Sequence, residues 1–312
     1  MKRLLVGYKA AELTPKLLDG ETTVHELDIY HAHAVEKTHP GVTVVCTPHL
    51  PKDDWDEIRF RTGPKVMSGE LSLDLLQEIH LLKPKSFVLD FDGKERDRND
   101  LLDKIRNDPD RVRNFAADWP ASVPGGPKMT FTSFPGCFCH RRLDEGGLAL
   151  AEVVSRELGQ RPGTLASPNP AQGGLRVLDM GCGCGLVGLL IAGTVEGVKL
   201  TMIDSHTRAV EAAKLNAAKF GADAEVILAD DGLDSRQSTD SYDVFVGNPP
   251  YYSDYRIAEV FLETARKALK TGGVCYTVVK NDAGLKPVQE RYFPSVAVIR
   301  RRGYCVLKSV KG

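Results

Sequence analysis

The stretch that decides the fold is Val177-Leu178-Asp179-Met180-Gly181-Cys182-Gly183-Cys184-Gly185. It begins as a buried strand, and glycine then occupies every second position up to an apolar helical segment, Leu186–Ala192. Glycine removes the crowding of a Cβ atom, so such a loop can fold against a ligand and offer backbone N–H groups to it. A dinucleotide-binding fingerprint would place a third glycine at position 186, where leucine stands. The pattern therefore predicts a ligand loop in an α/β fold and disfavours a dehydrogenase.

Strands and helices alternate on both sides of this loop. Apolar strands are expected at Leu175–Asp179, Lys199–Asp204, Glu225–Leu228, Val244–Gly247 and Val274–Val279. Helical patterns separate them, including one from Thr207 to Phe220. Near the end of the chain, two apolar segments flank residues 300–303, Arg-Arg-Arg-Gly, which predicts an antiparallel hairpin. The alternation predicts a parallel, doubly wound sheet whose ligands bind at the carboxyl ends of its strands.

Two further features follow strands of this predicted sheet. Asp204 ends the strand after the glycine loop, where its carboxylate can accept both hydroxyls of a ribose. Asn248-Pro249-Pro250-Tyr251 follows the strand at 244–247, and the two prolines fix φ and supply no N–H. The carbonyls of Asn248 and Pro249 can therefore accept the hydrogens of a planar NH2 group and aim its lone pair at an electrophile, while the Tyr251 ring offers a stacking surface. A rigid turn without chemistry is the structural alternative.

Asp179–Gly185, Asp204 and Asn248–Tyr251, in this order, resemble the class I S-adenosylmethionine-dependent methyltransferases that modify exocyclic or amide nitrogens. Residues Pro135–Leu148 resemble the segment that precedes the cofactor loop in ribosomal RNA guanine-N2 methyltransferases of the small-subunit type. The resemblance implies an α/β fold: a Rossmann-like, seven-stranded class I methyltransferase domain preceded by a smaller, degenerate methyltransferase-like domain. It implies S-adenosyl-L-methionine as cofactor and ribosomal RNA or the small ribosomal subunit as partner.

The resemblance also implies a set of site residues. The transfer machinery is Asn248, Pro249, Pro250 and Tyr251. The cofactor-binding residues are Asp179, Gly181, Cys182, Gly183, Gly185, Asp204, Ser205, Asp230, Asp231 and Asn248, with either Asp230 or Asp231 accepting from the adenine amino group. The substrate-binding residues are Phe138, Arg141, Arg142 and Tyr252.

The chain departs from the family pattern at Cys139, where serine is usual, at Cys184, where threonine or alanine is common, and at Tyr251-Tyr252, which replaces Phe-His. The tyrosine form also occurs in adenine-N6 and protein-glutamine N5 methyltransferases, so these targets stay open beside guanine N2 of ribosomal RNA. A non-catalytic RNA-binding assembly module is an alternative from another class.

The composition is that of an ordinary globular protein, with 42% hydrophobic and 27% charged residues and a net charge of −1. This balance argues against binding nucleic acid by bulk charge alone. No apolar stretch reaches the roughly 20 residues of a bilayer crossing, and the first residues lack a signal-peptide pattern. We therefore expect a cytoplasmic protein with no membrane partner, while the oligomeric state stays open.

Seven cysteines, an odd number, indicate thiols rather than a disulfide framework. Their Cys-x-Cys spacing is not the usual spacing of zinc ligands, so no metal is expected. Residues 119–127 hold three prolines and two glycines and are expected to interrupt regular structure. We place the domain boundary there, with residues 1–125 forming an N-terminal α/β domain for substrate recognition and residues 126–312 forming the S-adenosylmethionine-binding domain.

Overall fold

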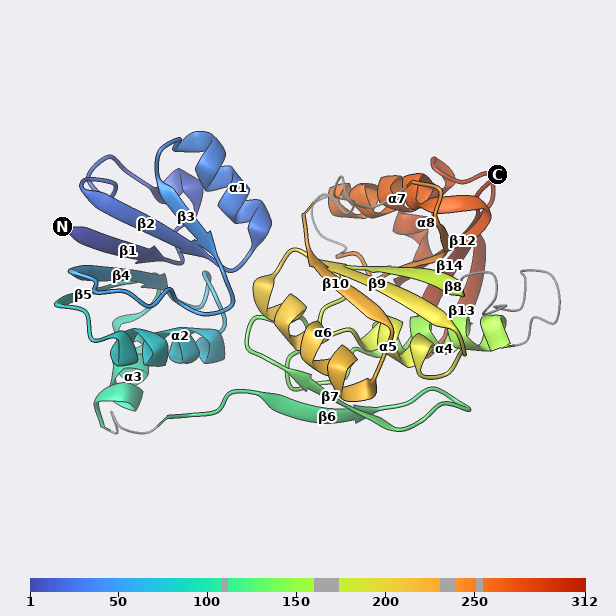
Figure 1. Cartoon of the computed structure of the whole chain (residues 1–312), viewed down its shortest axis with the longest axis horizontal. Coiled ribbons are helices and arrows are strands. Elements are labelled where there is room, and N and C mark those ends of the chain that lie inside the picture. The colour runs from blue at the N-terminus through green and yellow to red at the C-terminus, as the bar shows by residue number, and fades with distance from the viewer. Residues whose placement is uncertain (108–111, 160–173, 231–238, 251–254) are drawn as a thin grey trace. The chain divides into compact units, whose positions relative to one another are not determined.

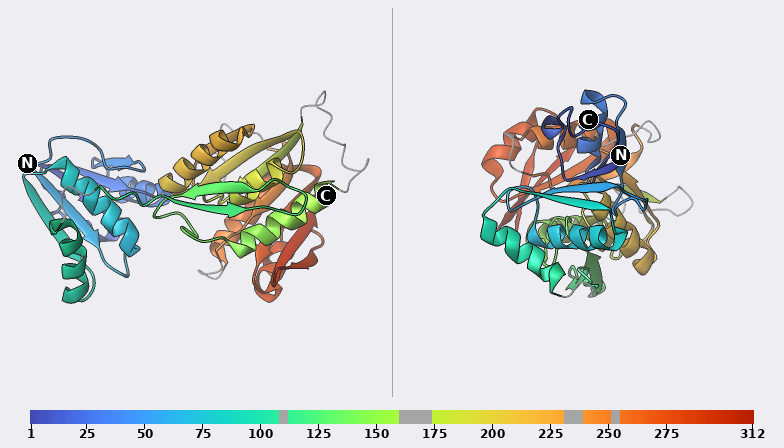
Figure 2. Two further views of the ribbon diagram at one scale, coloured as in Figure 1. Left: turned by 90° about the horizontal axis from the view of Figure 1, so that it is seen from below. Right: turned by 90° about the vertical axis from the view of Figure 1, so that its left-hand side faces the viewer.

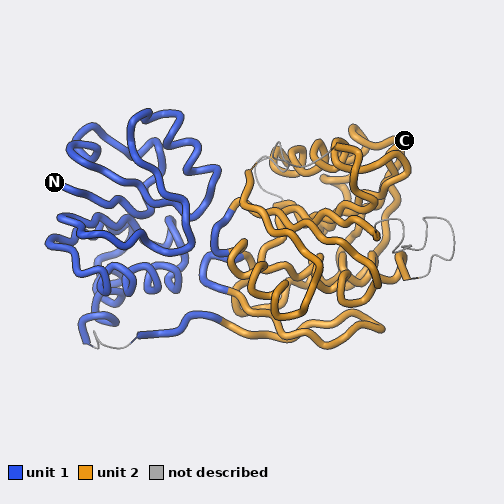
Figure 3. Tube along the Cα trace, viewed as in Figure 1, with its two compact units in different colours: residues 1–116, 134–137, 206–208 blue, residues 117–133, 138–205, 209–312 orange. Residues whose placement is uncertain are grey.

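The computed structural model describes residues 1–107, 112–159, 174–230, 239–250 and 255–312, which divide into two compact units (Figure 3). Unit 1 comprises residues 1–116, 134–137 and 206–208, and unit 2 comprises residues 117–133, 138–205 and 209–312. The boundary between residues 125 and 126 remains a prediction about independently folding domains. Residues 117–133, on both sides of it, belong to unit 2.

Unit 2 is built on a mostly parallel sheet (Figure 1). In its described residues, seven strands pair in the order β10-β9-β8-β11-β12-β14-β13. The strands are β8 (Leu175–Met180), β9 (Val198–Asp204), β10 (Ala224–Leu228), β11 (Tyr242–Gly247), β12 (Leu269–Val279), β13 (Ala297–Arg301) and β14 (Tyr304–Val310). The pairs β12–β14 and β13–β14 are antiparallel, and the others are parallel. This confirms the predicted α/β fold, its doubly wound sheet and its terminal hairpin.

Helices cover both faces of this sheet (Figures 1 and 2). One face carries α4 (Glu145–Gly159), α5 (Leu186–Ala192) and α6 (Thr207–Phe220), and the other carries α7 (Arg256–Ala268) and α8 (Asp282–Glu290). The bounds of α5 and α6 are those predicted from the sequence. Fully buried apolar side chains such as Leu262 and Leu269 form the core between the sheet and the second group of helices.

A two-stranded ribbon packs along α6. Its strands, β6 (Ala117–Ala121) and β7 (Met129–Ser133), are antiparallel. The buried side chain of Asn216 in α6 accepts from the N–H of Thr132 at 2.9 Å and donates to its carbonyl at 2.8 Å. Phe131 stacks on Trp119 and meets Phe220 edge-on. The ribbon is therefore fixed to α6 by one amide and an aromatic cluster.

The ribbon corrects one expectation. We expected residues 119–127 to interrupt regular structure, but Pro120 lies inside β6, opposite Thr130. A proline lacks the N–H that a central strand must donate, yet both strands of a two-stranded ribbon are edge strands. The missing donor therefore breaks no ladder bond that the fold needs.

Unit 1 contains a smaller sheet in which all pairings are parallel. As far as the structure describes this unit, five strands pair in the order β3-β2-β1-β4-β5. They are β1 (Lys2–Val6), β2 (Glu21–Glu26), β3 (Thr43–Cys46), β4 (Glu57–Thr62) and β5 (Ser86–Phe91). The helices are the short 3₁₀ turn η1 (Ala10–Glu12), α1 (Ile29–Thr38), α2 (Gly69–Leu82) and α3 (Glu95–Arg106). None of the helices in the described parts of either unit has the length and apolar character that a bilayer crossing requires.

The strand order of unit 1 repeats that of the first five strands in unit 2. The registers agree too, because Val6 pairs with His25 in unit 1 as Met180 pairs with Ile203 in unit 2. Glu26, which ends β2, therefore corresponds to the acid that ends β9. Burial raises the pKa of Glu26 to about 8. The sheet of unit 1 thus has the topology of the first five strands of the larger sheet, as the resemblance implied for the N-terminal domain.

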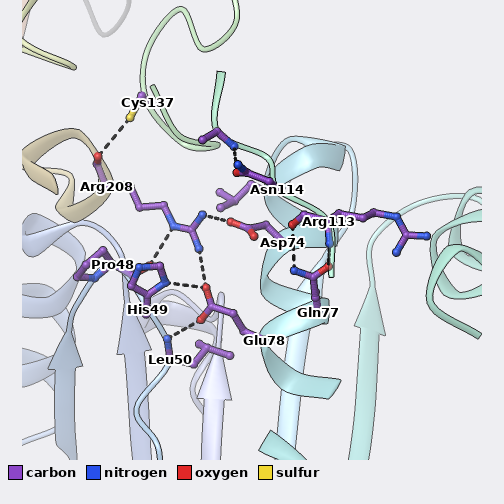
Figure 4. A network of polar contacts seen from close by, with 12 residues as sticks. Pro48, His49, Leu50, Asp74, Gln77, Glu78, Arg113, Asn114, Cys137 and Arg208 are labelled. Atoms are coloured by element: carbon purple, nitrogen blue, oxygen red, sulfur yellow. Dashed lines mark hydrogen bonds and ion pairs between the residues drawn. The ribbon is translucent and has the colours of Figure 1, made fainter. Parts of the chain in front are cut away.

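A network of polar contacts within unit 1 surrounds the side chain of Arg208 (Figure 4). The side chain is 2% exposed, and its guanidinium forms ion pairs with Asp74 and Glu78 of α2, the second at 3.1 Å. Its Nε donates to the carbonyl of Pro48 at 3.0 Å, and Glu78 also accepts from the N–H of Leu50 at 2.8 Å. The planar fork of an arginine suits this arrangement, because it donates to several acceptors at once.

We expect Arg208→Ala to lower the free energy of unfolding by about 3 kcal/mol, since removing one partner leaves largely buried carboxylates without their cation. Arg208→Lys keeps the charge but not the planar guanidinium, so its free energy of unfolding should fall by less than that of Arg208→Ala. Urea unfolding of the three proteins followed by circular dichroism measures both differences. Equal stability of the alanine variant and the parent protein would show that the network does not stabilise the fold.

Candidate active site

The strand register of unit 2 brings three loops to one edge of its sheet. Met180, the last residue of β8, lies beside Ile203 of β9 and beside Gly247, the last residue of β11. The residues that follow at this edge are the first glycine of the loop, Asp204 and Asn248. Parallel strands place their carboxyl ends at the same edge, which is where doubly wound folds bind ligands. The three motifs found in the sequence therefore share one location.

The glycine loop has a backbone that only glycine adopts readily. Gly181, Gly183 and Gly185 have φ values of 68°, 55° and 86°. A Cβ atom on Gly181 would lie 2.7 Å from the ring of Phe261, whereas one on Gly183 would meet no atom within 4 Å. Gly181 thus allows close packing against α7, and Gly183 borders open space from which a ligand can approach the backbone.

Asp204 is bound directly to this loop. Its Oδ2 accepts from the N–H of Gly183 at 2.8 Å. A carboxylate offers about four lone-pair sites, so this bond leaves capacity for further donors such as ribose hydroxyls. The predicted acid and the predicted glycine loop are therefore one hydrogen-bonded unit.

Asp179 lies behind the loop rather than at its open side. The side chain is 2% exposed, and its Oδ2 accepts from the N–H of Gly188 in α5 at 2.8 Å. Burial raises the pKa of Asp179 to about 7, the Gly188 N–H opposes this rise, and the nearby charge of Asp204 adds to it. Asp179 thus ties the strand to the helix that follows the loop, and its charge is costly there.

We expect Asp179→Asn to raise the melting temperature by about 2–4 °C at pH 8. An acid whose folded pKa is raised from 3.8 to about 7 stabilises the fold below pH 4 and loses this contribution as the pH rises to 7. The asparagine keeps an oxygen for Gly188 and does not titrate. Thermal denaturation of both proteins at pH 5 and pH 8 measures the effect.

The difference in melting temperature between Asp179→Asn and the parent should be smaller at pH 5, where the native aspartate is protonated. A difference that is the same at both pH values would contradict a raised pKa.

Asn248 follows β11 and is half-buried, and Pro249 after it is buried. The Asn248 Nδ2 donates to Oδ2 of Asp144 at 2.8 Å. Burial raises the pKa of Asp144, although N–H groups of Gly147, Asn248 and Gly146 oppose the rise. The predicted residues Tyr251 and Tyr252 lie outside the described residues.

Three of the other predicted cofactor residues are among the described residues: Cys182, Ser205 and Asp230. Cys182 is buried, its N–H donates to the carbonyl of Ile203 at 3.0 Å, and its sulfur lies 3.6 Å from the carbonyl oxygen of Gly183. Ser205 directly follows Asp204. Asp230 stands two residues beyond the end of β10, and Asp231 lies outside the described residues.

The predicted substrate-binding residues Phe138, Arg141 and Arg142 belong to one exposed segment of unit 2. Phe138 is 66% exposed, and both arginines are exposed. Cys139 and Arg141 have positive φ values of 54° and 63°. Non-glycine residues hold such conformations only where the surroundings enforce them, and they cluster at binding sites. The segment thus offers an aromatic ring and two cations on a constrained backbone.

Two residues of the site were not predicted from the sequence. Asn216 donates from Nδ2 to the carbonyl of Cys184 at 2.9 Å and so fixes the glycine loop as well as the ribbon. Its signal is an asparagine in the middle of a helix, a position this residue type does not favour. Asp144, which holds Asn248, precedes two glycines at the start of α4. That pattern is typical of a helix cap and indicates no site by itself.

The arginines of the terminal hairpin are bound within unit 2. Arg301 and Arg302 form ion pairs with the buried Glu152, and Arg302 also pairs with Glu145 at 3.2 Å. Arg300 lies 3.7 Å from Asp282. The cations of this turn therefore fasten the hairpin to α4 and α8.

Among the described residues, no group of three histidine, cysteine, aspartate or glutamate side chains could hold a metal ion. None of the seven cysteines forms a disulfide.

Residues 128–308 match the family model of the methyltransferase small domain. The match covers more than half of the chain and includes the glycine loop, Asp204 and Asn248. The chain belongs to the methyltransferase small domain family.

The names of two sequence relatives refer to the RNA of the small ribosomal subunit. A ribosomal RNA small subunit methyltransferase C of Pseudomonas syringae pv. tomato is 28% identical over 211 residues, which are 66% of this chain and 55% of the relative. A protein of the same name from Pseudomonas aeruginosa is 32% identical over 169 residues, covering 53% of this chain and 46% of the relative. The matched part thus spans about half the length of these relatives.

A solved structure resembles the whole chain. The T. thermophilus 16S rRNA N2 G1207 methyltransferase, in complex with AdoMet and guanosine, superimposes with a TM-score of 0.79 over 100% of this chain and 88% of that chain, at 18% identity. At this identity the similarity concerns the fold. It shows that the folds of both α/β units occur together in a known protein.

Proposed function

We propose that the protein is an S-adenosylmethionine-dependent N-methyltransferase that acts on an exocyclic amine of RNA, namely N2 of guanine in small-subunit ribosomal RNA. One observation carries this proposal: the open glycine loop, Asp204 and Asn248 follow adjacent strands at one edge of the sheet. The names of the sequence relatives support the RNA substrate, and the guanosine in the similar structure supports the base.

The residues at this edge fit the cofactor. Gly183 leaves room beside its backbone, and the carboxylate of Asp204, bound to the same loop, suits the hydroxyls of a ribose. We propose that Asp230 or Asp231, after the next strand, accepts from the adenine amino group. S-adenosylmethionine supplies an electrophilic methyl group on a sulfonium sulfur when bound.

The chain's own contribution to the transfer is to orient the target amine. The side-chain carbonyl of Asn248 and the backbone carbonyl of Pro249 accept the two N–H groups of an NH2 group, which turns its lone pair toward the methyl group. Tyr251 stacks on the base that carries the amine. No general base is needed in the transfer step, because the amine nitrogen becomes cationic as it gains the methyl group and loses a proton to water afterwards. The sulfonium would become a neutral thioether when its bond to the methyl group breaks.

An amine inside a duplex cannot reach such acceptors, so we propose that the target nucleotide is unpaired or flipped out of its stack. Phe138 and Tyr252 contact bases, and Arg141 and Arg142 contact phosphates of the same RNA. With ribosomal RNA as the substrate, we expect the protein to act in the cytoplasm and to need no membrane or metal partner.

We expect Asn248→Ala to lower methyl transfer by at least about a hundredfold, because acceptors that orient the reacting group act in the transition state. The Kd for S-adenosylmethionine should change by less than about threefold, or about 0.6 kcal/mol. The assay incubates methyl-labelled S-adenosylmethionine with unmodified small-subunit ribosomal RNA or subunits, digests the RNA to nucleosides and identifies the labelled product. Asn99→Ala, the same change at an exposed position of α3, is the control.

Label in N2-methylguanosine with the parent and the control, but not with Asn248→Ala, supports the proposal. Label in N6-methyladenosine would keep the mechanism and change the base, and label only in a glutamine of a protein substrate would replace RNA by protein. No transfer to any substrate despite tight cofactor binding would favour a non-catalytic role.

A further inference from the structure

Asp144 holds a fixed position at the start of α4. Its Oδ1 accepts from the N–H of Gly146 at 3.0 Å, and its backbone carbonyl accepts from the N–H of Leu148 at 2.9 Å. It is therefore the residue that caps this helix, and a carboxylate is favourable there because the helix dipole is positive at its N-terminus.

The two glycines after Asp144 allow the carboxylate to approach the helix closely. A Cβ atom on Gly147 would lie 2.6 Å from Oδ2 of Asp144, and one on Gly146 would lie 3.3 Å from Oδ1. Any other residue at 147 would push the carboxylate away. The position of Asp144 is thus set by backbone contacts within a few residues of it, and these contacts do not involve Asn248.

The N–H of Gly147 bonds to the same carboxylate, and Oδ2 also reaches a distant loop. Oδ2 accepts from Nδ2 of Asn248 at 2.8 Å, across 104 residues of sequence. An ionised carboxylate has no hydrogen to donate, so it accepts only the NH2 end of the amide. The nitrogen of Asn248 is therefore turned toward Asp144, and its Oδ1 is turned away from it.

This orientation matters for an amine substrate. The two ends of an asparagine amide have nearly the same shape and are distinguished only by their hydrogen-bond partners. With the oxygen outward, Asn248 accepts from an NH2 group. With the amide reversed, two donors would face each other and the substrate could not be held.

We propose that Asp144 is the positioning residue that fixes the side-chain amide of Asn248 with its carbonyl oxygen directed toward the target amine. This inference rests on the proposed function for the identity of that amine, while the orientation itself concerns residues of this chain alone. Asp144 touches neither the reacting amine nor the methyl group in this arrangement and acts through Asn248.

Two variants separate positioning from capping. Asp144→Asn keeps the size and a carbonyl oxygen for the Gly146 N–H, but it puts an NH2 group where Oδ2 stood, so Asn248 must reverse its amide. Asp144→Ser keeps a good helix cap and removes the second oxygen, so the amide is no longer held. We expect kcat to fall about a hundredfold for Asp144→Asn and about tenfold for Asp144→Ser, with KM and cofactor Kd changed by less than about threefold.

A second readout does not require activity. The side-chain NH2 of Asn248 is observed by NMR in protein labelled with ¹⁵N-asparagine and is assigned from its absence in Asn248→Ala. Its hydrogen exchange with water should be slow in the parent and faster in both variants, because the bond to a carboxylate is lost. Melting temperatures show whether the helix cap survives.

Lower kcat with faster exchange at Asn248 and little change in melting temperature supports the proposal. Parental kcat in Asp144→Asn, or a lower melting temperature with unchanged kcat, would show that Asp144 is only a helix cap. If the parent protein transfers no methyl group to any RNA or protein, the proposed function fails, and the exchange rates still decide whether Asp144 fixes the amide.

Discussion

The parallel register of β8 between β9 and β11 is the constraint on which the candidate site depends. Successive residues of a strand are about 3.3 Å apart and point to opposite faces of the sheet. A slip of one residue would therefore move a loop by more than the length of a hydrogen bond and would turn every side chain of that strand to the opposite face of the sheet. The buried residues Val177 and Phe245 hold the register, and with it the bond from Gly183 to Asp204.

The sequence predicted the parts of the fold that depend on neighbouring residues. The strands of the seven-stranded sheet, the bounds of α5 and α6 and the terminal hairpin follow from local periodicity, glycine positions and turn residues. The glycine loop, Asp204 and Asn248 were found for the same reason, because each directly follows an apolar strand. Pro120 was interpreted wrongly, since local sequence does not tell an edge strand from a central one.

Contacts between distant segments could not be predicted in this way. The bond from Asn248 to Asp144 spans 104 residues, and the ion pair from Arg208 to Asp74 spans 134. Each partner has a weak local signal: Arg208 is a cation in the first turn of a helix, where the dipole disfavours it, and Asp144 precedes two glycines. Such signals show that a residue has a partner somewhere, but only the fold identifies that partner.

Unit 1 shows that the sheet topology alone does not make the site. The last residue of β1 pairs with Phe60 as the last residue of β8 pairs with Gly247, so Arg61 corresponds to Asn248. A guanidinium only donates hydrogen bonds, and Arg61 forms an ion pair with Glu12 at 2.9 Å. It therefore cannot accept from an amine as an asparagine carbonyl can. Equivalent positions in the two sheets thus carry residues of different chemistry, and the chemistry proposed for unit 2 depends on Asn248 and on the carboxylate that orients it.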